Sequence, residues 1–102
     1  MRKKKFSIKY IGSYPAEKVR AYLEKFLNEV EKKLPQSATL KMVYYNFNER
    51  PLICNLQISF ADESNEGVFF TAEADYVHDI VKKISKHVYS YFRELERARK
   101  IA

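Results

Sequence analysis

The sequence predicts an α+β fold, a two-layer sandwich in which a four-stranded sheet carries both of two helices on one face. Two patterns lead to this fold class. Apolar and polar residues alternate in several short segments, which is typical of strands that bury one side. In two longer segments apolar residues recur at spacings of three and four, which is typical of amphipathic helices. The order along the chain is β-α-β-β-β-α, and two such helices are expected to share the apolar face of one sheet.

Local signals define where these elements begin and end. The clearest strand covers residues 52–60, where apolar and polar residues alternate throughout, which predicts a sheet that is covered on one side only. Pro15 suits the first turn of a helix, and Asp75 is of a type that commonly caps one. We expect strands at about residues 6–10, 40–47, 52–60 and 68–74, and helices at about residues 16–33 and 76–100.

The length of 102 residues suits a single domain, and the chain contains no repeat, low-complexity tract or linker. We therefore expect residues 1–102 to form one domain, with residues 1–5 as a flexible basic arm or a solubilising terminus. No apolar run approaches the ~20 residues that a bilayer span requires, and the N-terminus lacks the apolar stretch of a secretory signal. One cysteine permits no internal disulfide, which fits a cytoplasmic protein.

Residues that could carry catalysis form no constellation in this sequence. His78 and His87 are spaced so that a helix does not project both onto one face, and Cys54 falls on the apolar face of its strand. With two glycines in total, the chain offers no loop that could cradle a phosphate. We therefore expect no catalytic residue, no metal, no cofactor and no small-molecule substrate. The composition indicates a binding protein rather than an enzyme.

The net charge of +6 is unevenly distributed along the chain. Residues 2–5 are all basic, and residues 82–100 hold seven basic and two acidic residues. Residues 6–81 hold eight basic and eleven acidic residues, so the body of the protein is mildly acidic. Such polarity bears on association with a partner and not on the fold.

The basic residues of the last helix share one of its faces. At about 100° per residue, Arg93, Lys86, Arg97 and Lys100 fall within about 60° of Lys82, and Lys83 falls at about 100°. The apolar residues of this helix lie on the opposite side. A row of cations without interleaved acids suits a polyanion, because each contact displaces a condensed counterion. A merely solvated face remains the alternative, and it is at least as strong for Lys18, Lys25 and Lys32 of the first helix, since Glu29 lies among them.

An aromatic cluster near the end of the second expected strand permits two interpretations. Tyr44, Tyr45 and Phe47 lie close in sequence to Arg50. Aromatic and arginine side chains can stack on unpaired bases. Aromatics that alternate in a strand more often pack in the core, and we favour that interpretation.

Three segments resemble the short-form ribosome hibernation promoting factors, also called ribosome-associated inhibitor or protein Y. Residues 19–27 (VRAYLEKFL) are similar to the first-helix signature of that family, Leu-Arg-x-Tyr-Val-x-Lys-Lys-Leu. Residues 70–74 (FTAEA) are similar to its last strand, and residues 75–80 (DYVHDI) resemble the Asp-Met-Tyr-Ala-Ala-Ile that opens its final helix. The element order matches too, and we expect no segment of the kind that dimerises ribosomes in the long form of that family.

The chain also departs from the family pattern. The connection after Gly12 is shorter, and His78 and Asp79 replace alanines where the final helix begins. A family arginine falls on Tyr89, which puts that contact in doubt. The basic positions of the family match Arg20 and Lys25 in the first helix, and Lys86 and Arg93 in the last.

What the resemblance implies is a stoichiometric translation inhibitor of the stress response, which occupies the mRNA and tRNA channel of the small ribosomal subunit and contacts its RNA. The expected partner is therefore the small subunit, and the protein itself should be monomeric. The RNA contacts expected are Lys82, Lys86, Arg93, Arg97, Lys100 and Lys83, with Lys25 and Arg20 secondary. Two alternatives remain open: a stand-alone module for double-stranded RNA, and a protein-interaction adaptor with no RNA role.

Overall fold

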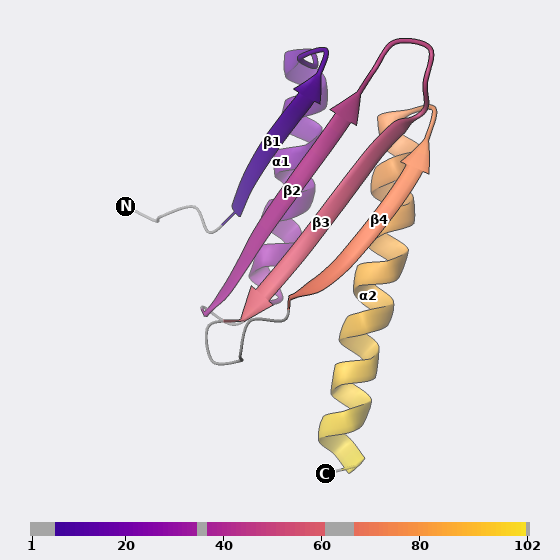
Figure 1. Ribbon diagram of the computed structural model, residues 1–102. Coiled ribbons are helices and arrows are strands. Elements are labelled where there is room, and N and C mark those ends of the chain that lie inside the picture. The colour runs from indigo at the N-terminus through magenta and orange to yellow at the C-terminus, as the bar shows by residue number, and fades with distance from the viewer. Residues whose placement is uncertain (1–5, 35–36, 61–66, 102) are drawn as a thin grey trace.

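The computed structural model describes residues 6–34, 37–60 and 67–101, with side chains up to residue 97 of the last helix. The elements follow the expected order β-α-β-β-β-α (Figure 1). The sheet has the order β1-β2-β3-β4, in which β1 pairs with β2 in parallel and the other neighbours are antiparallel. The bounds are β1 Phe6–Gly12, α1 Glu17–Lys32, β2 Ala38–Asn46, β3 Leu52–Phe60, β4 Val68–Ala74 and α2 Val77–Ile101.

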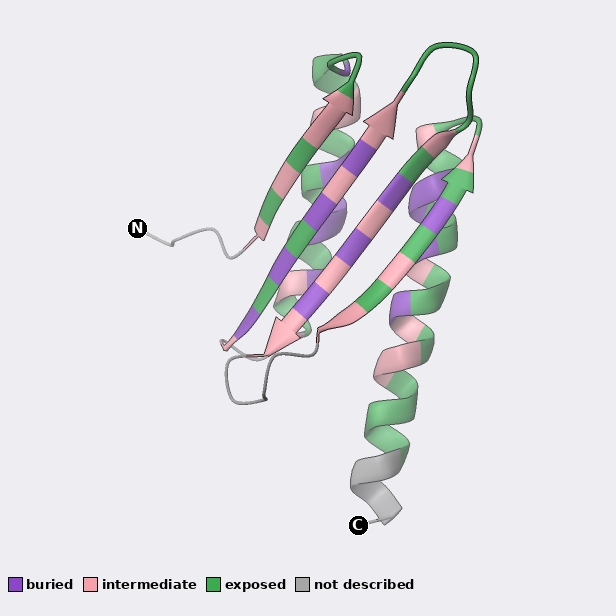
Figure 2. Cartoon of the chain, viewed as in Figure 1, coloured by how far each residue is buried: buried purple, intermediate pink, exposed green. Residues whose placement is uncertain are grey.

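Both helices cover the same face of the sheet, so the expected two-layer fold is confirmed (Figure 1). Buried residues alternate along the central strands, as purple bands show along β2 and β3 in Figure 2. The core between the layers is wholly apolar among the described residues. Full burial of each large aliphatic side chain contributes about 1.5–3 kcal/mol. The largest fully buried side chains are Tyr44, Leu23, Leu27, Leu40, Met42, Leu56, Ile58, Ile80, Ile84, Val30, Val88 and Cys54.

No helix of the described chain covers the opposite face of the sheet, as the alternation in β3 predicts. Strand register aligns its side chains in rows, one of which runs Ile11, Tyr45, Ile53 and Glu73. On β4, Phe69 is exposed on this face. We call it the open sheet face.

The two helices run in the same direction, and residues of α1 contact residues of α2 at the same separation in sequence in two places. The Tyr22 hydroxyl lies 2.9 Å from Nδ1 of His78, and Nζ of Lys33 lies 4.4 Å from the ring centroid of Tyr89. The members of both pairs are 56 positions apart in sequence. Because each helix advances by the same number of residues between the two contacts, the helices stay side by side and in the same register over about three turns.

Beyond the sheet, α2 continues as a projecting helix (Figures 1 and 2). Residues 93–97 are all exposed, including Leu95 on the side that faces the core in earlier turns. The last turns of α2 therefore lack apolar support from the sheet within the described part of the chain.

The start of α2 corrects one expectation about helix capping. The helix begins at Val77, and its first backbone hydrogen bonds run from the N–H groups of Asp79 and Ile80 to the carbonyl oxygen of Tyr76. Asp75 lies one residue too early to accept from the first turn, and its carboxylate makes no hydrogen bond with a described residue. The prediction that Asp75 caps the helix is therefore wrong.

Gly12 fixes the route from β1 into α1. Its φ is +92°, and a Cβ here would collide with the carbonyl oxygen of Asn46, which accepts a 2.8 Å hydrogen bond from the N–H of Ser13. Only glycine adopts this conformation so close to another backbone without strain.

The bounds of β2 differ slightly from those expected, because β2 covers residues 38–46 and so lies up to two residues earlier. No helix of the described residues is both long enough and apolar enough to cross a membrane.

Candidate nucleic-acid interface

The surface of the two helices that points away from the sheet forms the candidate interface, which we call the helix-layer face. On α2, Ile80, Ile84 and Val88 are buried against the sheet, so residues on the opposite side of the helix point outward. Four basic residues occupy that outer side, and all are exposed: Lys82, Lys86, Arg93 and Arg97. They follow one another over about four turns, a length of roughly 22 Å. The structure therefore brings together four of the six α2 residues expected from the sequence.

These four cations are not neutralised within the described part of the protein. Lys82, Lys86 and Arg97 make no hydrogen bond or ion pair there, and Arg93 makes only a 3.4 Å contact from Nη2 to Oγ of Ser90. An anion that approaches this row has no internal ion pair to break. These cations can therefore contact a ligand without first losing an internal partner.

Lys83 occupies a different position from its neighbours. Its Nζ donates a 2.7 Å hydrogen bond to the carbonyl oxygen of Glu73 at the end of β4. This contact ties the start of α2 to the edge of the sheet. Lys83 thus has a structural partner already, whereas Lys82 and Lys86 have none among the described residues.

The first helix adds basic residues to the same face. Leu23, Leu27 and Val30 are buried against the sheet, which places Lys25 on the outer side of α1. Two further lysines, Lys18 and Lys32, are exposed on that side. Because the outer sides of α1 and α2 point the same way, the structure joins Lys25 to the α2 row.

Arg20, by contrast, lies on the side of α1 that is turned away from α2. Its guanidinium carbon is 4.7 Å from the ring centroid of Tyr14, and Nη1 donates a 3.0 Å hydrogen bond to the hydroxyl of that residue. Its Nε is buried and has no hydrogen-bond partner. Tyr14 packs edge-on against Tyr10 of β1, so Arg20 belongs to an aromatic cluster at the β1 edge. The structure does not bring Arg20 together with the other expected contacts.

Lys33 is a basic residue of this surface that sequence reasoning missed. It follows α1 directly and places its ammonium over the ring of Tyr89 on α2. A cation over an aromatic face gains roughly 0.5–1 kcal/mol at an exposed site. Tyr89 is the position where the family pattern has an arginine, so this chain holds a positive charge beside that position from the other helix. No local pattern could reveal it, because the contact spans 56 positions.

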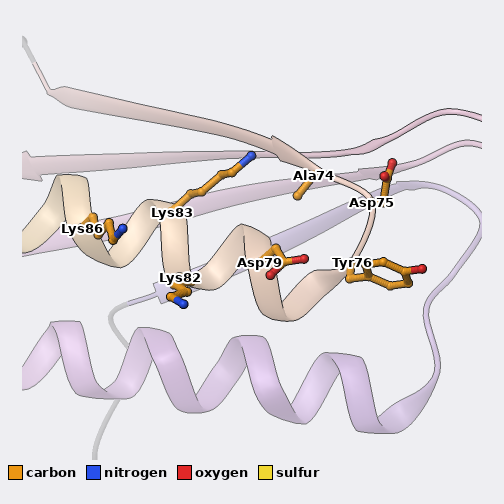
Figure 3. Close-up of a pocket in the computed structure, with 7 residues that line it drawn as sticks. All are labelled: Ala74, Asp75, Tyr76, Asp79, Lys82, Lys83 and Lys86. Atoms are coloured by element: carbon orange, nitrogen blue, oxygen red, sulfur yellow. The ribbon is translucent and has the colours of Figure 1, made fainter.

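A hollow of about 460 Å³ opens where α2 begins (Figure 3). It is lined by Ala74, Asp75, Tyr76, Asp79, Lys82, Lys83 and Lys86. In Figure 3, Lys83 reaches toward the strands, whereas Lys82 extends on the side of α1.

The remaining residues singled out from the sequence lie away from the helix-layer face or outside the described residues. Lys100 is within α2, but its side chain and the basic residues 2–5 are outside the described residues. Within the aromatic cluster, Tyr44 is buried in the core, which confirms the packing interpretation for that residue, whereas Phe47 and Arg50 are exposed in the β2–β3 turn.

The cysteine lies where the sequence placed it. Cys54 is fully buried in the core, and burial raises the pKa of its thiol to about 12. A thiol this far from ionisation is not a nucleophile near neutral pH. Among the described residues, no group of three or more His, Cys, Asp or Glu side chains could hold a metal ion.

Fold and site together define a small two-layer α+β protein whose helix layer presents unpaired cations on one face. Comparison with known proteins adds two solved structures with a similar fold. A ribosomal subunit interface protein from Coxiella burnetii superposes with a TM-score of 0.64 at 13% identity, covering 93% of this chain and 97% of that one. The Thermus thermophilus Protein Y N-terminal domain superposes with a TM-score of 0.59 at 16% identity, covering 83% and 93%.

These likenesses confirm the fold that the sequence resemblance implied. No protein-family model and no curated protein matches the sequence. This chain therefore shares with the two structures the arrangement of strands and helices, at low sequence identity.

Proposed function

We propose that this protein is a non-enzymatic, cytoplasmic ribosome-binding factor that holds the small subunit in an idle state. The observation that carries the proposal is the row of unpaired cations on the outer side of α2, Lys82, Lys86, Arg93 and Arg97. Two structures with the same fold, described as a ribosomal subunit interface protein and a Protein Y domain, support the ribosome as the partner. The protein acts as a monomer and as one domain.

The row suits ribosomal RNA because of its length and its lack of pairing. Cations spaced along roughly 22 Å of helix can each meet a backbone phosphate, and each contact releases a counterion. Lys25 and Lys33 broaden the row into a two-helix surface. Contacts of this kind fix the position of a protein on RNA without reading its sequence.

Inhibition follows from occupancy rather than from chemistry. A protein bound by its helix layer in the channel of the small subunit excludes mRNA and tRNA from the same volume. No bond needs to be made or broken, so one protein inactivates one ribosome in a stress-responsive, reversible manner.

A charge-reversal experiment tests the proposal. The Lys86→Glu, Arg93→Glu double variant is expected to lose co-sedimentation with small subunits at moderate salt, because it turns two attractive contacts into repulsive ones. Both side chains are exposed, so the fold should persist by circular dichroism. The matched control is Lys9→Glu, Lys41→Glu, which makes the same change of net charge on the open sheet face and should still pellet. Undiminished pelleting of the first variant would overturn the proposal.

The open sheet face supports the adaptor as a second candidate, because Phe69 and Ile53 are exposed there without a covering helix. Nuclease treatment of an extract separates the two functions, since an adaptor would keep its partner when the RNA is destroyed. A gel shift on naked duplex RNA distinguishes the stand-alone module, which would bind the duplex tightly and ribosomes not at all.

A further inference from the structure

The hollow at the start of α2 contains two carboxylates that a phosphate-binding surface does not explain. Asp75 and Asp79 line it beside Lys82 and Lys86, and neither carboxylate makes an ion pair or hydrogen bond with a described residue. Asp75 also does not cap the helix. Each of these negative charges repels a phosphate, so their presence within the basic face calls for a different ligand group.

Tyr76 supplies a second unusual element of the same hollow. It immediately precedes α2 and is 70% exposed, so most of its ring faces solvent. In Figure 3 its side chain points away from the helix at the end of the hollow opposite the lysines. Its described contacts are backbone hydrogen bonds that its carbonyl oxygen accepts. An exposed ring of this kind is a platform on which an unpaired base can stack.

We propose that the hollow binds one unpaired nucleotide of the RNA and selects its base. The base stacks on Tyr76, its exocyclic amino group donates to Asp79, and the adjoining phosphates contact Lys82 and Lys86. Carboxylates accept from the amino groups of cytosine, adenine and guanine, whereas uracil presents a carbonyl oxygen at that edge. The hollow therefore disfavours uracil. This inference rests on the proposed function and adds base selectivity to a surface that otherwise contacts only the RNA backbone.

Whether replacement of Asp79 strengthens or weakens RNA binding tests the proposal. If the carboxylates only repel RNA or support the helix, Asp79→Ala removes a negative charge and should strengthen binding. If they accept from a base, the same substitution should weaken it. Because Asp79 also lies in the first turn of α2, thermal unfolding must show that the variant remains folded, and Asp79→Asn, which keeps the shape of the side chain, serves as the second variant.

The probes are six-nucleotide oligocytidylate and oligouridylate, which have equal charge and a pyrimidine ring of the same size but differ in the exocyclic group. Fluorescence anisotropy with the full chain should give about tenfold tighter binding of oligocytidylate. The preference should fall to about twofold or less in Asp79→Ala and in Asp79→Asn, and Tyr76→Ala should weaken both oligonucleotides about equally. Equal affinity of the unaltered protein for the two oligonucleotides, or stronger binding by Asp79→Ala, would overturn the inference.

Ribosome binding provides a readout that separates this inference from the proposed function. Tyr76→Ala should weaken co-sedimentation severalfold, and Phe69→Ala, which removes an equally exposed ring from the open sheet face, should not. If Lys86→Glu, Arg93→Glu abolishes pelleting while Tyr76→Ala leaves it unchanged, the proposed function stands and the nucleotide site does not. If all of these variants pellet normally, the helix layer is not the interface and both fail.

Discussion

The number of unpaired cations on α2 predicts how steeply ribosome binding should depend on salt. Four contacts, from Lys82, Lys86, Arg93 and Arg97, contribute about −3.6 to the slope of log K against log salt, because each neutralised phosphate contributes about −0.9. These four contacts alone should lower the affinity about 150-fold between 50 and 200 mM salt.

Replacing two of the four cations by alanine should halve the contribution of this row. For Lys86→Ala, Arg93→Ala the row should contribute only about −1.8 to the slope, which corresponds to a loss of about 12-fold between 50 and 200 mM salt. Alanine is used rather than glutamate because it removes contacts without adding repulsion, so the slope counts lost contacts directly.

The assay is the binding of labelled protein to purified small subunits across a series of potassium chloride concentrations. Lys9→Ala, Lys41→Ala is the control, because it lowers the net charge by the same amount on the open sheet face. The control should keep the slope of the unaltered protein. A slope that changes equally in both variants would show that net charge, and not the α2 row, drives the association, and would refute the reasoning.

Two further predictions concern the core. Ile84→Ala should lower the free energy of unfolding by about 2–5 kcal/mol in urea denaturation, because it leaves a cavity in place of a fully buried side chain. Leu95→Ala, at a position 36% exposed beyond the sheet, should lower it clearly less. Equal losses in the two variants would contradict the projecting helix. Burial raises the pKa of Cys54 from 9.0 to about 12, so as the pH rises the unfolded chain releases this proton before the folded protein does. The free energy of unfolding should therefore fall as the pH rises above about 9, by about 1.4 kcal/mol at pH 10. Cys54→Ala should show a smaller fall over the same pH range, and an identical fall would remove Cys54 as its cause.

The elements were largely predictable because each carries its own periodicity. The strand at residues 52–60 alternates without interruption, and the structure places β3 at Leu52–Phe60. The apolar stripe of the last helix gave the direction of its basic side as well, since residues on opposite sides of one helix face opposite ways. Asp75 shows the limit of such local signals: the residue type suits a cap, but the helix begins one residue too late for it to act as one.

The site was only partly predictable, because its composition depends on how the two helices are placed. Arg20 and Lys25 are near neighbours on α1, yet one packs on Tyr14 at the β1 edge and the other is exposed on the helix-layer face. Lys83 adjoins Lys82, yet its ammonium is bound to a carbonyl oxygen of β4. Assigning these roles requires the positions of β1 and β4, which no window of the sequence contains.

Periodicity within single segments was enough to establish the fold class, the buried side of each element and the cationic side of α2. Which cations share a surface depends instead on how the helices and strands pack together. The parallel alignment of α1 and α2 brings Lys33 over Tyr89, and the end of β4 joins Asp75 to the first turns of α2 to form the hollow. Such contacts arise between residues far apart in the chain, and their geometry is set by packing across the shared core.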